Sequence, residues 1–128
     1  MVNTGRVALG VAALRSGEFA RGPEYLHNLV TGKMCCLGVF TYIAIRNGLD
    51  ITVDTSGDHA IFGGRDGETL CWEVSDWYGF DDDDPLLEDE HGNGGYATKW
   101  NDDGDPAYGI VREDFTDIAD AFGRAYLS

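Results

Sequence analysis

Aliphatic residues recur at helical spacing near the start of the chain. Three of them fall on one face of a helix: Val7, Val11 and Leu14. This pattern predicts a helix over about residues 4–16. Asn3 or Thr4 can supply its N-cap and Gly17 its stop, because short polar side chains bond the free amides of a first turn and glycine ends helices readily.

The strongest helical pattern lies near the other end of the chain. Asp114 is a candidate N-cap, and Asp117 stands three residues further on. The residues that follow Asp114 place one apolar face toward a core: Phe115, Ile118, Ala119 and Phe122. We therefore predict a final helix in this region.

Between these two helices, the segment from Cys36 to Asn47 is apolar almost all round. A helix of this kind is buried on several sides, so we predict that it forms the centre of the fold. Gly48 follows it, at the position where a helix end favours a left-handed residue.

Weaker patterns fill the rest of the chain. The Gly-Pro pair that ends at Pro23 favours a short helix reaching Leu29. Residues 73–78 can form one helical turn that stops at Gly79, and residues 96–101 fit the period of a strand as well as that of a helix.

Short β-branched or aromatic pieces at residues 51–53 and 60–62 predict strands, and Asp66-Gly67 predicts a tight hairpin turn. We find no internal repeat and no second domain. The predicted fold class is α+β: a compact, mainly helical single domain over residues 1–128, with a central buried helix and a small β hairpin or sheet.

The net charge of the chain disfavours some classes of function. The chain has 23 acidic and 9 basic residues and a formal net charge of -14, which disfavours direct binding to nucleic acid or to an anionic membrane. Three origins of this acidity stay open: codon usage in a GC-rich genome, a high-salt cytoplasm, and mimicry of DNA.

The acids concentrate in one block: Asp81, Asp82, Asp83, Asp84, Glu88, Asp89 and Glu90. A DNA mimic must hold such carboxylates as an ordered, contiguous face. Pro85 and the glycine-rich stretch after the block favour a flexible, solvated loop instead, so we expect that partner binding does not need the block.

No apolar run approaches the ~20 residues of a membrane span, and the start lacks a secretory signal, so a soluble cytoplasmic protein is expected. Cys35 and Cys36 are adjacent, so at most one of them can pair with Cys71. In a reducing cytosol all three are expected to be free thiols.

Four motifs follow one another in a specific order: Leu14-Arg15-Ser16-Gly17, Cys35 to Val39, Val74 with Trp77 and Gly79, and Trp100-Asn101-Asp102 followed by Phe115 to Asp120. In this order they resemble a group of small uncharacterised proteins of tailed bacteriophages and prophages, especially of actinobacteria. The resemblance implies an origin and a fold but no reaction. The chain departs from the group at Trp100, where an aliphatic residue is usual, and in a longer insertion over residues 103–112.

Cys36 is the sharpest candidate for chemistry. A helix N-terminus lowers the pKa of a thiol, and His59 with Asp66 or Glu73 would complete an order similar to that of papain-like hydrolases. The alternative is that Cys36 is a small apolar core residue, the commonest role of free cysteine.

Metal binding has less support. The cysteines lack the second pair that a structural zinc site needs. Asn101, Asp103 and Asp105 alternate like the start of a calcium loop, but Pro106 replaces the required glycine and Arg112 stands where the bidentate acid belongs. We expect no metal and no other cofactor.

Aromatic residues are the remaining candidates. Trp72, Trp77, Tyr78 and Trp100 can be core or recognition residues, with core favoured for two of them. The predicted binding set is Trp77, Tyr78, Trp100, Asn101 and Asp102, although Asn101-Asp102 also suits a local turn. The preferred function is a small acidic phage accessory protein that binds and modulates a host or defence macromolecule without catalysis, with DNA mimicry as a special case. The alternative is a cysteine-dependent hydrolase that uses Cys36 and His59.

Overall fold

Helix α2 (Cys36–Arg46) is the centre of the molecule, as predicted. The computed structural model describes residues 2–104 and 111–127. Eight residues of α2 are buried: Cys36, Leu37, Gly38, Val39, Phe40, Thr41, Ile43 and Ala44. The helix ends at Arg46, and Gly48 has a φ of 102°, the left-handed conformation expected after the end of a helix.

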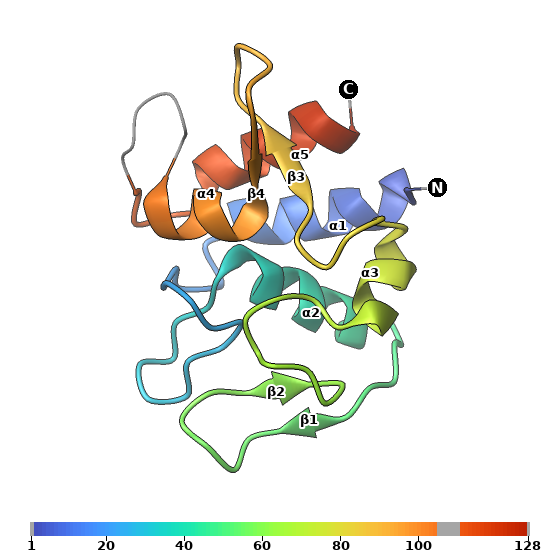
Figure 1. Cartoon of the computed structure of the whole chain (residues 1–128), viewed down its shortest axis with the longest axis vertical. Helices are drawn as coiled ribbons and strands as arrows, with labels where there is room; N and C mark the ends of the chain where they lie inside the picture. Colours follow the sequence, from blue (N-terminus) through green and yellow to red (C-terminus); the bar gives the residue numbers. More distant parts are fainter. Residues whose placement is uncertain (1, 105–110, 128) are drawn as a thin grey trace.

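Helix α1 (Thr4–Arg15) packs on both α2 and the last helix of the chain. It begins where predicted, since the Asn3 side chain accepts a hydrogen bond from the Arg6 amide at 3.1 Å. It lies between α2 and the final helix α5 (Thr116–Tyr126) (Figure 1). The predicted apolar face of α5 is buried, but the helix begins two residues after Asp114, which instead accepts a hydrogen bond from the Thr116 amide.

Aromatic rings join the helices. Phe40 of α2 stacks on Phe122 of α5, with 4.4 Å between ring centroids, and contacts Tyr78 at 4.9 Å. Tyr78 belongs to helix α3 (Trp72–Tyr78), which ends at the left-handed Gly79, as the sequence predicts. The Tyr78 hydroxyl donates a 2.6 Å hydrogen bond to the Phe40 carbonyl oxygen. These contacts hold α3 against the central helix.

Two small antiparallel sheets lie at opposite ends of the molecule (Figure 1). Strand β1 (Val53–Asp54) pairs with β2 (Ile61–Phe62). Strand β3 (Leu86–Glu88) pairs with β4 (Gly94–Tyr96), which leads directly into helix α4 (Ala97–Asp103). The α+β fold class is confirmed, and the ambiguous segment at 96–101 is mainly helical.

Two local predictions are wrong. The segment after Pro23 is not helical: Glu24 has a φ of 71°, which a helix cannot contain, and His27 and Asn28 form isolated β-bridges. Asp66-Gly67 makes a turn, but the hairpin is closed earlier, between β1 and β2. Within the described part of the chain, no helix has both the length and the apolar character needed to cross a membrane.

Candidate functional site

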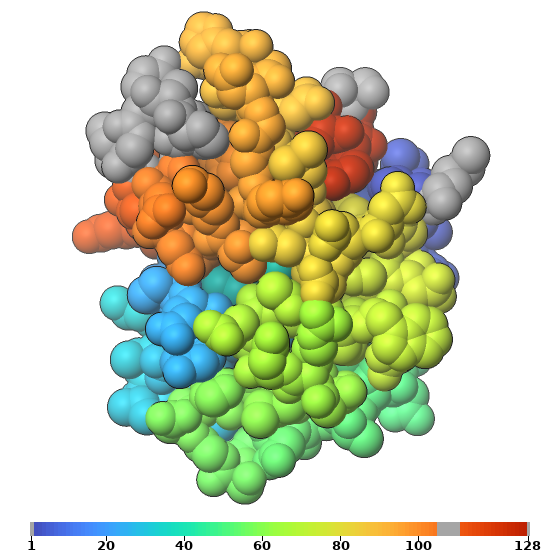
Figure 2. Space-filling model, viewed as in Figure 1, coloured from blue at the N-terminus to red at the C-terminus, as the bar shows by residue number. Residues whose placement is uncertain are grey.

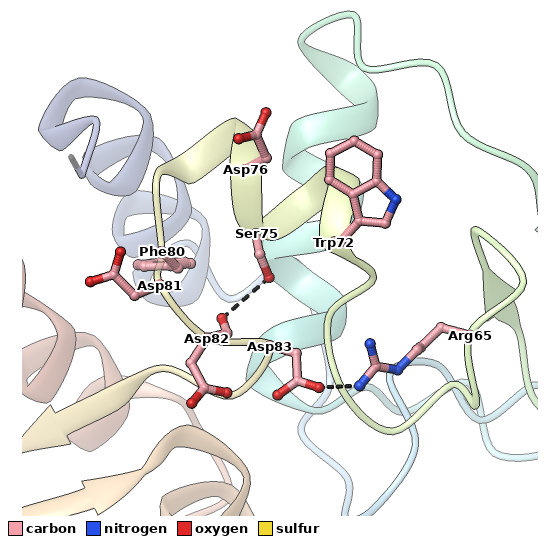
Figure 3. Close-up of a pocket in the computed structure, with 8 residues that line it drawn as sticks. All are labelled: Arg65, Trp72, Ser75, Asp76, Phe80, Asp81, Asp82 and Asp83. Atoms are coloured by element: carbon pink, nitrogen blue, oxygen red, sulfur yellow. Dashed lines mark hydrogen bonds and ion pairs between the residues drawn. The ribbon is translucent and has the colours of Figure 1, made fainter.

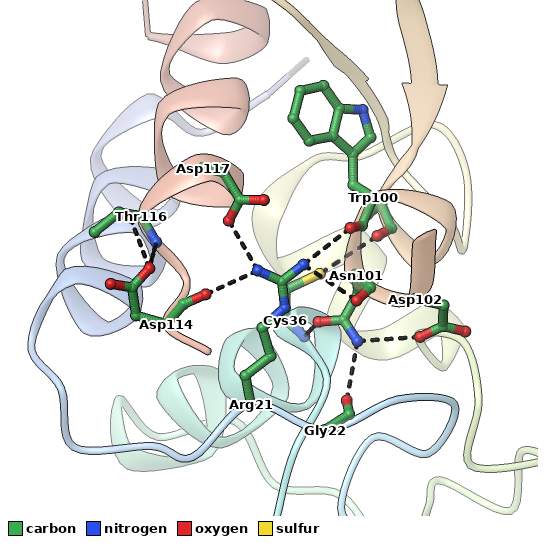
Figure 4. A network of polar contacts seen from close by, with 10 residues as sticks. Arg21, Gly22, Cys36, Trp100, Asn101, Asp102, Asp114, Thr116 and Asp117 are labelled. Atoms are coloured by element: carbon green, nitrogen blue, oxygen red, sulfur yellow. Dashed lines mark hydrogen bonds and ion pairs between the residues drawn. The ribbon is translucent and has the colours of Figure 1, made fainter. Parts of the chain in front are cut away.

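The motif from Cys35 to Val39 and the motif Trp100-Asn101-Asp102 meet at one side chain, that of Asn101. Its Oδ1 atom accepts the backbone N–H of Cys36 at 3.0 Å, at the first turn of α2. Its Nδ2 donates to the Gly22 carbonyl oxygen at 2.9 Å and to the Asp102 carboxylate at 3.1 Å (Figure 4). Asn101 therefore caps a helix that is far away in the sequence, so the interpretation of Asn101-Asp102 as a local turn is wrong for Asn101.

Arg21 is the second centre of this buried network, and the sequence did not single it out. The guanidinium lies between α4 and α5 (Figure 4). It donates to Asp117 Oδ1 at 2.8 Å and to three backbone carbonyl oxygens at 2.8–3.1 Å, those of Asp114, Trp100 and Asn101. The side chains of Arg21 and Asp117 are 2% and 9% exposed, so the pair is shielded from water and acts as an internal clamp.

The same network seals the candidate nucleophile. Cys36 is fully buried, and its thiol lies 3.7 Å from the Ala97 carbonyl oxygen. Burial raises the pKa of Cys36 well above its usual range, and burial likewise raises the pKa of Cys35 to about 12. The hypothesis of a lowered thiol pKa is not supported, because burial raises the pKa more than the helix N-terminus lowers it. The alternative, that Cys36 is a small apolar core residue, is confirmed.

His59 has other partners. Its ring stacks on Tyr25 with 4.0 Å between centroids, and its Nδ1 lies 2.9 Å from a carboxylate oxygen of Asp58. Within residues 2–104 and 111–127, no hydrogen bond joins His59 to Cys36 or to the proposed orienting acids Asp66 and Glu73. The structure thus offers no assembled Cys-His pair.

The predicted aromatic binding set is mostly core. Tyr78, Trp100 and Asn101 are 0–1% exposed and cannot meet a partner, so their assignment to a binding surface is wrong. Trp77 is half-buried and is covered on one face by Arg6, whose guanidinium carbon lies 4.3 Å from the ring centroid. Asp102 is exposed, but its Oδ1 accepts the amide of the left-handed Glu24 at 3.0 Å.

Among the described residues, Trp72 is the most exposed large aromatic side chain, ahead of Tyr96 at 52%. The exposed fraction of Trp72 is 71%, and it stands at the first turn of α3, opposite the face that Val74 and Tyr78 bury. It borders a hollow of about 270 Å³ lined by Arg65, Trp72, Ser75, Asp76, Phe80, Asp81, Asp82 and Asp83 (Figure 3). In Figure 2 the green-to-yellow part of the chain, which carries α3 and these acids, lies at the surface in view.

The acids around the hollow are ordered by specific partners. Asp83 forms an ion pair with Arg65, and Asp82 accepts the Asp84 amide at 3.1 Å. A hydrogen bond between the two carboxyl groups raises the pKa of Asp83 and lowers that of Asp82. By contrast, Asp76 and Asp81 are exposed, and their carboxylates make no hydrogen bond or ion pair among the described residues.

The expectation of a flexible, solvated acidic block needs correction. Asp84 accepts the Thr98 amide at 3.0 Å and its hydroxyl at 2.5 Å, which fixes the first turn of α4. Asp89 is 2% exposed and accepts the amides of His91 and Asn93, both at 2.8 Å, in the turn between β3 and β4. These two acids build the fold rather than a charged face.

The candidate metal sites gain no support. Among the described residues, no group of three acidic, histidine or cysteine side chains is placed to hold a metal ion. For the candidate calcium loop, Asn101 is committed to the network around Cys36, and Asp105 and Pro106 lie outside the described residues. The cysteines at 35, 36 and 71 are free thiols, as expected.

The comparisons with known proteins identify a family whose function is unknown. The family model described as "Domain of unknown function (DUF8296)" matches residues 7–122, and the chain belongs to this family. The matched range includes Arg21, Asn101 and Trp72. No curated protein matches the chain, and no solved structure does.

Proposed function

We propose that this chain is a small acidic accessory protein of the phage type, which binds and modulates a host or defence protein without catalysis. The carrying observation is the exposure of Trp72 at 71%, beside the acidic hollow. Tryptophan is among the residue types most enriched at binding hot spots.

Three further observations support binding over chemistry. The candidate nucleophile is sealed, with its thiol pKa raised by burial. The candidate base, His59, stacks on a tyrosine and is not joined to that thiol by any hydrogen bond among the described residues. The accessible surface beside the hollow presents a tryptophan, a residue type that is enriched at protein interfaces.

The carboxylates favour a protein partner over mimicry of DNA. A mimic needs an evenly spaced array of outward-facing charges. In the acidic block Asp89 is buried, Asp84 caps α4, and Asp83 is paired with Arg65. The remaining exposed acids do not form a continuous row along the chain, so we place the proposed binding at the hollow.

Removing the indole tests this function. The tagged wild-type protein is used to capture proteins from an actinobacterial lysate, in parallel with Trp72→Ala. We expect Trp72→Ala to melt within a few degrees of wild type and to lose about tenfold or more of the specific partner, because an exposed hot spot contributes binding energy and little stability.

Two control variants locate the effect. Val30→Ala removes another exposed apolar side chain, 79% exposed in a loop, and a folded Cys36→Ala variant removes the candidate nucleophile; both should capture the same partner as wild type. Equal capture by wild type and Trp72→Ala would refute the proposed function. A partner lost only with Cys36→Ala would return the cysteine hydrolase to consideration.

A further inference from the structure

We propose that the hollow beside Trp72 accepts a positively charged side chain, arginine in particular, from a basic segment of the partner protein, and that Arg65 of this chain competes for the same carboxylate. The inference rests on the proposed function and names the chemistry of its partner. Three observations on one surface support the proposal: the size of the hollow, the charge around it, and the ion pair between Arg65 and Asp83.

Charge complementarity points to a basic segment. Four acidic residues are among those that line the hollow, Asp76, Asp81, Asp82 and Asp83, against the single arginine, Arg65. The net charge of the whole chain, -14, adds a long-range field of the same sign. Such a surface attracts cationic segments and repels acidic ones before contact is made.

The lining fits a guanidinium in particular. A volume of about 270 Å³ has room for one long side chain, and two aromatic residues, Trp72 and Phe80, are among those that line it. A planar guanidinium stacks on such rings while its N–H groups reach carboxylates. The protein uses this pairing on itself, since Arg6 covers Trp77 at 4.3 Å and Arg46 covers Phe19 at 5.2 Å.

Arg65 already occupies part of this site. Its guanidinium donates to Asp83, and Figure 3 shows the two side chains reaching toward each other at the edge of the hollow. The pair is accessible to water, with side chains 41% and 34% exposed. Ion pairs this exposed are weak and exchange readily. An incoming arginine can therefore take the Asp83 carboxylate, while the Arg65 side chain moves into solvent.

The proposal predicts that removing the positive charge of Arg65 strengthens binding of a basic segment and that removing negative charges from the same surface weakens it. Arg65→Gln removes the competitor, so it should tighten binding of a basic segment. Asp76→Asn with Asp81→Asn removes two attracting charges without removing a hydrogen bond or ion pair among the described residues, so it should weaken binding. Glu113→Gln is the matched control, because it neutralises an exposed acid that does not line the hollow.

The probes are three synthetic peptides of alternating sequence: glycine with arginine, glycine with citrulline, and glycine with glutamate. Citrulline keeps the shape of arginine without its charge. Calorimetric titration of the wild-type protein should show binding of the arginine peptide alone, weakening as salt rises from about 50 to about 300 mM. We expect Arg65→Gln to tighten it about two- to fivefold and the double Asp variant to weaken it about fivefold or more.

Any other result of these titrations contradicts one part of the proposal. If Arg65→Gln weakens binding or leaves it unchanged, Arg65 is not a competitor; if the citrulline peptide binds as tightly as the arginine peptide, the site does not select a cation. If Glu113→Gln weakens binding as much as the double Asp variant, the attraction is nonspecific. Failure of the proposed function is distinct, because it appears as partner capture that Trp72→Ala does not change.

Discussion

A Gly38→Ala variant is expected to lose about 3 kcal/mol of stability or to fail to fold, because the new methyl group has no space. A Cβ atom at this position would lie 1.8 Å from the Leu26 carbonyl oxygen and 2.6 Å from its carbon. Both atoms belong to the backbone, so no side-chain rotation relieves the overlap. Denaturant unfolding followed by circular dichroism measures the loss.

Gly123→Ala in α5 is the matched control. It makes the same chemical change in a helix where no atom lies within 4 Å of the added Cβ. Alanine is favoured over glycine inside helices, so this variant should gain about 0.5–1 kcal/mol. If the two substitutions had equal effects, the close approach of α2 to the Leu26 segment would be contradicted.

Arg21→Met is expected to cost about 3–5 kcal/mol, the range for breaking a buried ion pair from one side. The substitution keeps much of the aliphatic stem but leaves the Asp117 carboxylate buried without its cation. It also removes the donors to the carbonyl oxygens of Trp100 and Asn101. Arg21→Lys should recover only part of the loss, because an ammonium group cannot reproduce the planar fork of donors.

Arg15→Met provides the comparison for this prediction. Arg15 also pairs with an aspartate of α5, Asp120, at 2.7 Å, but both side chains are about half exposed at 48% and 50%. An exposed pair of this kind contributes about 0–1 kcal/mol. Similar melting temperatures for the two variants would show that the Arg21 clamp is not shielded from water.

The helices were predictable because their signals are local. The spacing of Val7, Val11 and Leu14 fixed the buried face of α1, and glycines marked the ends of α2 and α3 at 48 and 79. The same reasoning failed at Pro23, because the left-handed Glu24 is held by the side chain of Asp102, far away in the sequence. The conformation of Glu24 depends on this tertiary contact, so the residues around Pro23 do not predict it.

The buried polar network of Arg21 and Asn101 could not be predicted from the sequence, because it also depends on tertiary contacts. Asn101 caps a helix that begins 65 positions earlier, and Arg21 reads in the sequence like any other surface arginine. The motifs that contain Cys36, Asn101 and Asp117 belong to one sequence pattern, but their order along the chain does not show that these residues meet. The structure shows that this pattern builds the fold.

The exposed tryptophan was within reach of sequence reasoning. Val74 and Tyr78 are four residues apart and define the inner face of the short helix α3. Trp72, two residues before Val74, then falls on the outer face, whereas Tyr78 must be core. Applying helical periodicity to residues 72–78 would have replaced Tyr78 with Trp72 in the predicted binding set.

Mapping the binding surface by nuclear magnetic resonance tests the central claim most directly. Uniformly ¹⁵N-labelled protein is titrated with the glycine-arginine peptide, and amide and indole shifts are followed. The account predicts progressive shifts at residues 65, 72–76 and 80–83, largest at the Trp72 indole N–H, with Val30 and Glu113 unchanged. Shifts centred on another surface, or none at peptide concentrations that saturate the calorimetric signal, would contradict the assignment of this hollow as the binding site.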